Sequence, residues 1–218
     1  MCWNRVDVAE AKLICGDMTD LKSDVMIEFG FALFETPIGS CGIVWNDRGI
    51  AGVQLPEADE RAMRSRILRR FPGVSEAVPP ADVQRVVDDI AALLNGVPRD
   101  LGYVKIDTTA LPDFHRRVYD VARTIPAGAT LSYGKIAEQL GDRLLARDVG
   151  EALGQNPFPI IVPCHRVLAA GGKMGGFSAR GGVRTKLRLL SIEGAEPSGP
   201  TLFEALPLAA GPRRRRSP

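Results

Sequence analysis

The sequence predicts an α+β protein in which a small mixed domain precedes a mainly helical one. Short apolar runs separated by turn residues come first, and amphipathic helical segments dominate after residue 112. The 218 residues are 45% hydrophobic and 25% charged, which is ordinary for a globular protein. We therefore divide the chain into an N-terminal extension (1–27), an α+β domain (28–107), a second domain (112–195) and a disordered basic tail (196–218).

The first domain is expected to hold an antiparallel meander and two helices. Three apolar runs are separated by turn residues; they are residues 30–35, 41–45 and 50–55. Helical composition follows at 57–71, and a helix over 81–95 has Val83 and Ile90 on its apolar face. We expect one more strand at 103–106. Nothing in this half resembles a catalytic cluster.

The second domain begins with helices after a linker at 108–112. Asp113 is expected to cap the first of them, and Ser132 a short helix that ends before Gly141. A further helix, about 144–154, follows after a tight connection. Two short helices joined in this way are typical of a helix-turn-helix.

The remaining chain should be extended and then helical. Three prolines between residues 156 and 167 exclude a helix and predict a fixed extended path. A loop with six glycines covers 171–182, and a last helix is expected over 183–192.

Charge indicates where a partner would bind. Residues 112–195 carry 12 basic and 7 acidic side chains, a net charge of +5, whereas residues 28–111 carry 9 and 12, a net charge of −3. A nucleic-acid partner is therefore expected on the second domain. No apolar run approaches the roughly 20 residues that span a bilayer, and residues 1–21 lack a signal-peptide core, so we expect a cytoplasmic protein without membrane contact.

The chain has four cysteines, Cys2, Cys15, Cys41 and Cys164, and two histidines. None of the cysteines has the spacing of a zinc knuckle, so we expect neither a metal site nor a disulfide. The first three are interpreted as buried small side chains or as part of a mobile end.

The helix at about 144–154 has an unusual outward face. Its inward residues are Leu145, Val149, Ala152 and Leu153, and its outward residues are Arg147, Gly150, Glu151 and Gly154. Two glycines cost roughly 1 kcal/mol each in a helix. Close approach to a DNA groove and a tight internal helix–helix contact both explain them, and the pattern does not choose between these two.

Cys164 is the candidate nucleophile. A thiol reacts as its thiolate, whose unperturbed pKa is about 8.5, and burial beside Ile161 and Val162 would raise that pKa. A base must therefore activate it, and His165 is adjacent, with Glu193 placed to orient the imidazole. On an extended segment the two neighbouring side chains point to opposite sides, so a bridging water is expected. A Cys-His dipeptide alone also fits a buried inert cysteine.

The wider sequence resembles the O6-alkylguanine-DNA alkyltransferases. The resemblance rests on Asn156 to Val167, which reads NPFPIIVPCHRV, and on four flanking segments in the same order. They are Ser132-Tyr133, Ala146 to Leu153, Gly175 to Ser178, and Leu189 to Gly194. The resemblance covers about residues 28–195, and it is strong from residue 112 onward.

The resemblance implies a ribonuclease H-like first domain and a winged helix-turn-helix-like second domain. It implies direct repair of double-stranded DNA, in which an alkyl group moves irreversibly from O6 of guanine to Cys164 after base flipping. O4 of thymine is left open as a second position. Since nothing regenerates the thiol from the thioether product, turnover is one. The protein is its own co-substrate, so no cofactor is implied, and we expect a monomer.

Residue roles follow from the same resemblance. His165 deprotonates Cys164 through water, Glu193 holds His165, Asn156 braces the turn before the nucleophile, and Tyr133 rotates the nucleotide and donates a proton to the ring. The expected DNA contacts are Arg147, which fills the vacated stack, Tyr133, Ala146, Gly150 and Ala152. The expected substrate pocket comprises the Cys164 and Val167 carbonyls, Ser178, Gly175, Phe177 and Pro159.

Asp148 stands where the family usually has a small residue, and Glu151 adds a second acid, so both predict weaker DNA affinity.

Three other interpretations of the function remain open. A lesion sensor would bind alkylated DNA without transfer, although such proteins replace the reactive cysteine. A transcription factor would use the helix-turn-helix alone. A cysteine hydrolase would use Cys164, His165 and Glu193 over many turnovers.

Overall fold

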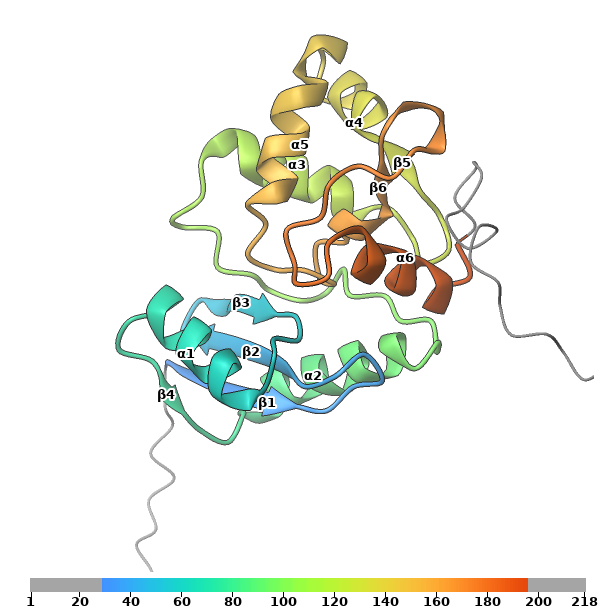
Figure 1. Cartoon of the computed structure of the whole chain (residues 1–218). Helices are drawn as coiled ribbons and strands as arrows, with labels where there is room; N and C mark the ends of the chain where they lie inside the picture. The colour runs from blue at the N-terminus through green and yellow to red at the C-terminus, as the bar shows by residue number, and fades with distance from the viewer. Residues whose placement is uncertain (1–28, 196–218) are drawn as a thin grey trace, which may run out of the picture.

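The computed structural model describes residues 29–195 as two packed lobes, drawn below and above in Figure 1. The predicted extension (1–27) and basic tail (196–218) lie outside the described residues. Within the described part, no helix is long and apolar enough to cross a membrane.

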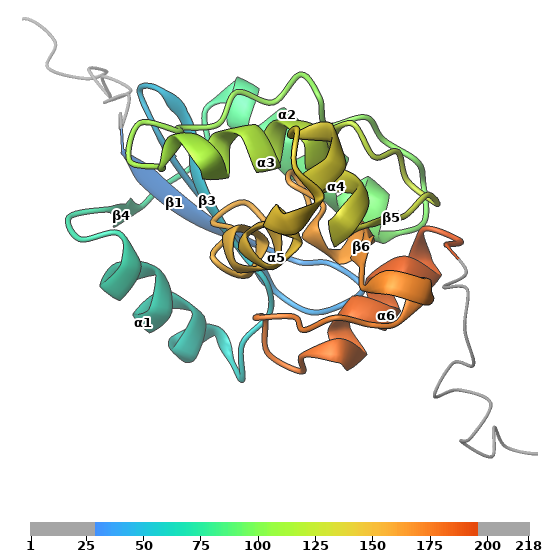
Figure 2. The ribbon, with the colours of Figure 1, turned by 90° about the horizontal axis from the view of Figure 1, so that it is seen from above.

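The N-terminal lobe is a four-stranded sheet with a helix on each face (Figures 1 and 2). Its strands are β1 (Gly30–Phe34), β2 (Cys41–Asn46), β3 (Gly49–Gln54) and β4 (Ser75–Glu76), in the order β3-β2-β1-β4. The first three form the predicted antiparallel meander, and β4 runs parallel to β1. Helices α1 (Glu60–Arg70) and α2 (Ala81–Leu94) lie on opposite sides of this sheet.

Alternation along the strands explains this layering. Phe31 and Val44 pack with Met63 and Ile67 of α1, whereas the neighbouring residues of β1 and β2 pack toward α2. Successive side chains of a strand point to opposite faces, so a strand that is apolar at consecutive positions must be covered twice. The apolar face predicted for α2 is buried as expected.

The strand predicted at 103–106 is wrong. Only Ile106 pairs with the sheet, through an isolated bridge to Ile50. Arg123 explains the difference, because its guanidinium donates to the carbonyls of Leu101 (3.2 Å), Gly102 (2.8 Å) and Val104 (2.8 Å). These carbonyls therefore find a side-chain partner in place of a neighbouring strand.

The C-terminal lobe is mainly helical, with a short parallel strand pair (Figure 1). Its α-helices are α3 (Asp113–Arg123), α4 (Tyr133–Gln139), α5 (Ala146–Gly154) and α6 (Val183–Ile192). Its 3₁₀ helices are η1 (Arg143–Leu145), η2 (Cys164–Arg166) and η3 (Ala170–Gly172), and its strands are β5 (Leu131–Ser132) and β6 (Val167–Leu168). The helices α4 and α5 are the pair expected from the sequence.

The two predicted caps have different outcomes. Ser132 caps α4 as expected, since its hydroxyl accepts from the Lys135 amide at 3.2 Å. The cap at Asp113 is wrong by one residue, because Pro112 takes that position without a side-chain hydrogen bond. Asp113 is instead the first helical residue and forms an ion pair with Arg116.

One continuous apolar core joins the lobes, with α2, α3, α4, α5 and the segment before Cys164 in the same cluster. The Val53 amide of β3 donates to the Pro157 carbonyl at 2.9 Å, and the buried Tyr119 hydroxyl donates to the Ala152 carbonyl at 2.8 Å. The first bond ties the segment before Cys164 to the N-terminal lobe, and the second joins α3 to α5 within the C-terminal lobe.

Candidate active site

The segment that carries Cys164 is shaped by a side chain. Asn156 donates from Nδ2 to the Val162 carbonyl at 2.8 Å and accepts from the Phe158 amide at 2.9 Å. The loop between turns tightly, and Ile160 takes a φ of 76°. Such a backbone is strained for a β-branched residue and persists only where its surroundings fix it. The bracing contacts expected of Asn156 are therefore present.

The prediction of a fully extended path to Val167 is wrong at one place. The prolines do exclude an α-helix, but Cys164 to Arg166 form the 3₁₀ turn η2. Pro163 explains this geometry, since its carbonyl accepts from the Arg166 amide at 2.9 Å and closes the turn. Cys164 and His165 therefore leave the backbone from a turn.

His165 is fully buried and is held by Glu193 from the C-terminal end of α6. The Nε2 atom lies 3.0 Å from Oε1 of Glu193. Arg166 binds both oxygens of the same carboxylate, through Nε at 2.8 Å and Nη2 at 2.8 Å, and its Nη1 donates to the Ile125 carbonyl. Sequence reasoning paired Glu193 with His165 but missed Arg166 as a second partner.

This arrangement fixes the histidine tautomer. The hydrogen bonds from His165 and Arg166 outweigh burial and lower the pKa of Glu193 from 4.5 to about 2, so it is ionised at neutral pH. Burial lowers the pKa of His165, so its ring is neutral. A neutral ring facing a carboxylate donates from Nε2, which leaves Nδ1 as the basic nitrogen. Nδ1 is buried and has no hydrogen-bond partner among the described residues.

Cys164 needs such a base. Burial raises the pKa of its thiol, while the Asn156 side chain and the charge of Lys186 act in the opposite direction. Cys41 is also buried, and there burial raises the thiol pKa to about 12. Cys41 fits its interpretation as an inert side chain, whereas Cys164 lies among polar groups that favour its thiolate.

Lys186 is a second residue that sequence reasoning missed. Its side chain is fully buried, its ammonium donates to the Val167 carbonyl at 2.6 Å, and it lies 5.8 Å from the centre of the Tyr133 ring. Burial lowers its pKa to about 8. The spacing offered a signal, since Lys186 shares the inward stripe of α6 with Val183, Leu187 and Leu190.

A cavity of about 520 Å³ opens above Cys164, between α4, α5 and the glycine loop. Its lining residues are Tyr133, Ala146, Arg147, Gly150, Leu153, Gly154, Cys164, Gly176, Phe177 and Ser178. It thus brings the nucleophile together with six of the residues expected in the DNA interface and substrate pocket. Burial raises the pKa of Tyr133, which keeps its phenol protonated.

Four other expected residues lie elsewhere. A Cβ added to Gly175 would come within 2.6 Å of the Tyr133 hydroxyl oxygen, so Gly175 supports Tyr133. Pro159 lines a second, smaller cavity that also reaches Cys164. Val167 is buried, and its carbonyl already accepts from Lys186. Ala152 is completely buried, so its side chain cannot contact DNA and this prediction is wrong.

The outward glycines of α5 can now be interpreted. No described atom lies within 4 Å of a Cβ added to Gly154, and one added to Gly150 meets only the Tyr133 ring at 3.9 Å. An internal helix–helix contact therefore does not explain these glycines. Asp148 and Glu151 line a separate hollow with Phe114, away from the cavity above Cys164.

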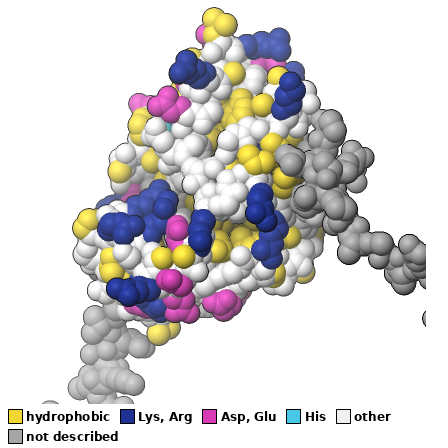
Figure 3. Space-filling model, in the orientation of Figure 1, with side chains coloured by type: hydrophobic (Ala, Val, Ile, Leu, Met, Phe, Trp, Pro, Cys, Tyr) yellow, Lys and Arg dark blue, Asp and Glu magenta, His cyan; other side chains and the backbone are white. Residues whose placement is uncertain are grey.

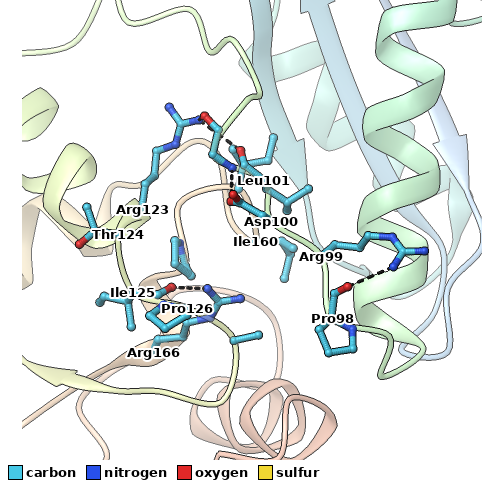
Figure 4. A pocket seen from close by; sticks show the side chains of 14 residues that line it. Pro98, Arg99, Asp100, Leu101, Arg123, Thr124, Ile125, Pro126, Ile160 and Arg166 are labelled. Atoms are coloured by element: carbon cyan, nitrogen blue, oxygen red, sulfur yellow. Dashed lines mark hydrogen bonds between the residues drawn. The ribbon is translucent and has the colours of Figure 1, made fainter.

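Behind the nucleophile's segment lies another cavity, of about 630 Å³ (Figure 4). Loop residues 98–102 and 123–127 line it, together with Ile160, Pro163 and Arg166. Figure 4 shows Arg166 and Arg123 reaching backbone carbonyls there, so both guanidiniums serve structure. Among the described residues, no group of three His, Cys, Asp or Glu side chains could hold a metal ion.

Comparison with known proteins identifies the class of domain to which the C-terminal lobe belongs. Residues 113–195 match the family model described as 6-O-methylguanine DNA methyltransferase, DNA binding domain. The methylated-DNA–protein-cysteine methyltransferase of Methanothermobacter thermautotrophicus is 33% identical over 163 residues, which cover 75% of this chain and 84% of that protein. Its namesake from Mycobacterium tuberculosis is 50% identical over 93 residues, 42% of this chain and 55% of that protein.

Solved structures agree with this class. The crystal structure of Mycobacterium tuberculosis O6-methylguanine methyltransferase has a TM-score of 0.61 and 33% identity, and the match covers 80% of this chain and 99% of that one. The O6-methylguanine-DNA methyltransferase of Pyrococcus kodakaraensis has a TM-score of 0.60 and 26% identity, covering 76% and 99%. The chain belongs to the family of methylated-DNA–protein-cysteine methyltransferases, and the α+β class predicted from sequence is confirmed.

Proposed function

We propose that this protein repairs DNA by moving an alkyl group from O6 of guanine onto Cys164, once per molecule. Family membership supports the reaction class. The observation that carries the residue assignment is the hydrogen bond between Glu193 and Nε2 of His165. It leaves Nδ1 of this buried, neutral imidazole free to act as the base for the neighbouring Cys164. A bridging water relays the proton from the thiol to Nδ1.

The proposed step balances without a cofactor. The thiolate of Cys164 attacks the alkyl carbon, the S–C bond forms as the C–O6 bond breaks, and the electron pair returns to the guanine. The Tyr133 hydroxyl, which lines the cavity with Cys164, supplies the proton that the departing base needs, and the proton that His165 took from the thiol passes through water to restore the phenol. A thioether is not a group that water displaces, so the thiol is not regenerated and turnover is one.

Double-stranded DNA carrying O6-alkylguanine is the proposed partner, bound by a monomer. We assign the lobes to ribonuclease H-like and winged helix-turn-helix-like folds, with α5 in the minor groove. The outward-facing glycines of α5 support the minor-groove assignment, because residues without a side chain permit close approach to a duplex. Arg147 is exposed, lines the mouth of the cavity and is placed to replace a flipped base.

The Arg147→Ala variant tests this assignment. Transfer from duplex DNA containing O6-methylguanine should slow at least tenfold, whereas transfer from free O6-benzylguanine, which needs no flipping, should be nearly unchanged. Arg116→Ala on the exposed face of α3 is the matched control. Equal slowing with both substrates would remove Arg147 from base flipping.

The same assay separates the alternatives. Tight binding of alkylated DNA without transfer would support the lesion sensor, and more than one product per protein would support the hydrolase. Sequence-specific binding that Cys164→Ala leaves intact and alkylation does not change would support the transcription factor.

A further inference from the structure

Cys164 lies where two cavities meet. Besides the cavity of about 520 Å³ beside α5, a smaller one of about 50 Å³ extends from Cys164 toward the N-terminal lobe. Cys164, Phe177 and Ser178 line both. A flipped base fills part of the larger space under the proposed function, and the smaller cavity offers further room beside the sulfur for a short substituent. The smaller cavity is adjacent to that position.

The smaller cavity is cationic. Two arginines of α1, Arg66 and Arg70, line it, and among the described residues no acidic side chain does. Glu57 neutralises Arg66, since its carboxylate lies 3.2 Å from the Arg66 Nε atom. Lysine and arginine side chains gather over α1 in Figure 3.

Of the two arginines that line the smaller cavity, Arg70 is the one without a counter-ion among the described residues. Within the described part of the chain it forms no ion pair or hydrogen bond, and its guanidinium carbon instead lies 5.5 Å from the centre of the Phe71 ring. Arg70 is exposed, but desolvation by the surrounding protein and the neighbouring charge of Arg66 lower its pKa, and it stays protonated at neutral pH. An anion in the smaller cavity would pair with the Arg70 guanidinium and offset the unfavourable effects of desolvation and of the Arg66 charge.

We propose that Arg70 is a specificity-determining residue that favours short anionic alkyl groups, carboxymethyl above all, as substrates for Cys164. The inference rests on the proposed alkyl transfer. The thiolate attacks the methylene carbon, the C–O6 bond breaks, and the carboxylate passes unchanged onto the sulfur as S-carboxymethylcysteine. Arg70 takes no part in the bond exchange; it pairs with the carboxylate, as a guanidinium does with planar anions.

The size of the cavity limits the substituent. About 50 Å³ admits a group of a few heavy atoms, which matches a carboxymethyl group and excludes a benzyl ring from this side. The hydroxyl of Ser178, which also lines the cavity, offers a donor that an uncharged carbamoylmethyl group could use equally. Charge alone then distinguishes the two substituents.

The test compares two isosteric substrates in matched variants. Single-turnover rates are measured with duplexes containing O6-carboxymethylguanine or O6-carbamoylmethylguanine, and Cys164 modification is read by mass spectrometry. Arg70→Gln should lower the ratio of the carboxymethyl rate to the carbamoylmethyl rate roughly two- to fivefold, since exposed ion pairs are weak. Arg69→Gln is the control, because Arg69 is exposed, bonds Ser65 and does not line the cavity.

Each outcome decides the proposal. A lower ratio in Arg70→Gln, unchanged in Arg69→Gln and largely restored in Arg70→Lys, supports it. An unchanged ratio overturns it, and equal slowing with both substrates would place Arg70 against a DNA phosphate. Normal transfer from O6-methylguanine with an unchanged ratio leaves the proposed function intact, whereas no transfer from O6-methylguanine by the wild type overturns both.

Discussion

Replacing Glu193 by Gln is expected to destabilise the protein strongly, although the two side chains have nearly the same shape. The carboxylate accepts hydrogen bonds from His165 Nε2 at 3.0 Å and from Arg166 at 2.8 Å and 2.8 Å. A glutamine at this position would offer one acceptor oxygen and turn an NH₂ group toward donors. Arg166 would stay buried, with 8% of its side chain exposed, and would lose its counter-ion.

Breaking a buried ion pair at one partner costs about 3–5 kcal/mol. In a protein of this size, 1 kcal/mol lowers the melting temperature by about 2–4 °C, so Glu193→Gln should lower it by roughly 10 °C. The exposed Glu138, which pairs with Lys135 at 2.9 Å, provides the control. Glu138→Gln should shift the melting temperature by about 1 °C at most, because exposed ion pairs contribute little.

Thermal unfolding followed by circular dichroism measures both variants. Adding Arg166→Met to Glu193→Gln should restore part of the loss, because the uncompensated buried charge is then gone. A shift of less than about 2 °C in Glu193→Gln would refute the reasoning, since Arg166 would then be neutralised by some other group.

The same contacts lead to three further predictions. Glu193 has a pKa of about 2 in the folded protein and 4.5 ordinarily, so the unfolded chain binds its proton more readily. Stability on the order of 3 kcal/mol should therefore be lost as pH falls from 4.5 to 2. Urea unfolding across this pH range should show a smaller loss of stability in Glu193→Gln than in the wild type. Tyr119→Phe removes the hydroxyl donor of the Ala152 carbonyl, which keeps only the Gln155 amide at 3.2 Å, and should lower the free energy of unfolding by about 1 kcal/mol; an unchanged urea midpoint would argue against that bond. Gly175→Ala places a Cβ 2.6 Å from the Tyr133 hydroxyl oxygen, so transfer should slow while the melting temperature changes by only a few degrees; an unchanged rate would show that Tyr133 has room to move.

The elements that sequence predicted well are those with a strong local pattern. The meander alternates apolar runs with turns, and α2 buries the stripe that its 3.6-residue spacing indicated. The strand β4 was missed because it has two residues, both exposed, and so leaves no periodic pattern. The strand expected at 103–106 failed because Arg123, about twenty residues further on, bonds the carbonyl of Val104 and those of the two residues before Tyr103.

The candidate site shows the same division between local and long-range information. The resemblance around Cys164 placed His165, Asn156 and Glu193 in one constellation, and the structure brings their contacts together. Arg166 was missed because its bonds reach 27 and 41 residues along the chain, to Glu193 and the Ile125 carbonyl. Residue types and spacing alone contain no record of such pairings.

Lys186 and Ala152 illustrate burial that residue type alone predicts poorly. A lysine is rarely fully buried, so the residue type of Lys186 argues against the core position that its place on the inward stripe of α6 indicates. The sequence assigns Ala152 both to the inward face of α5 and to the DNA interface. The structure places it entirely in the core, which decides between these two assignments.

The central claim is that Cys164 is the alkyl acceptor, and intact-protein mass spectrometry tests it most directly. The protein is mixed with a duplex carrying one O6-methylguanine, and the product is mapped by peptide. We predict a gain of one methyl group, roughly 14 Da, on Cys164, saturating at one equivalent. Cys41, whose buried thiol has a pKa of about 12, should remain unmodified. No gain in mass, or a methyl group on Cys41, would contradict the account.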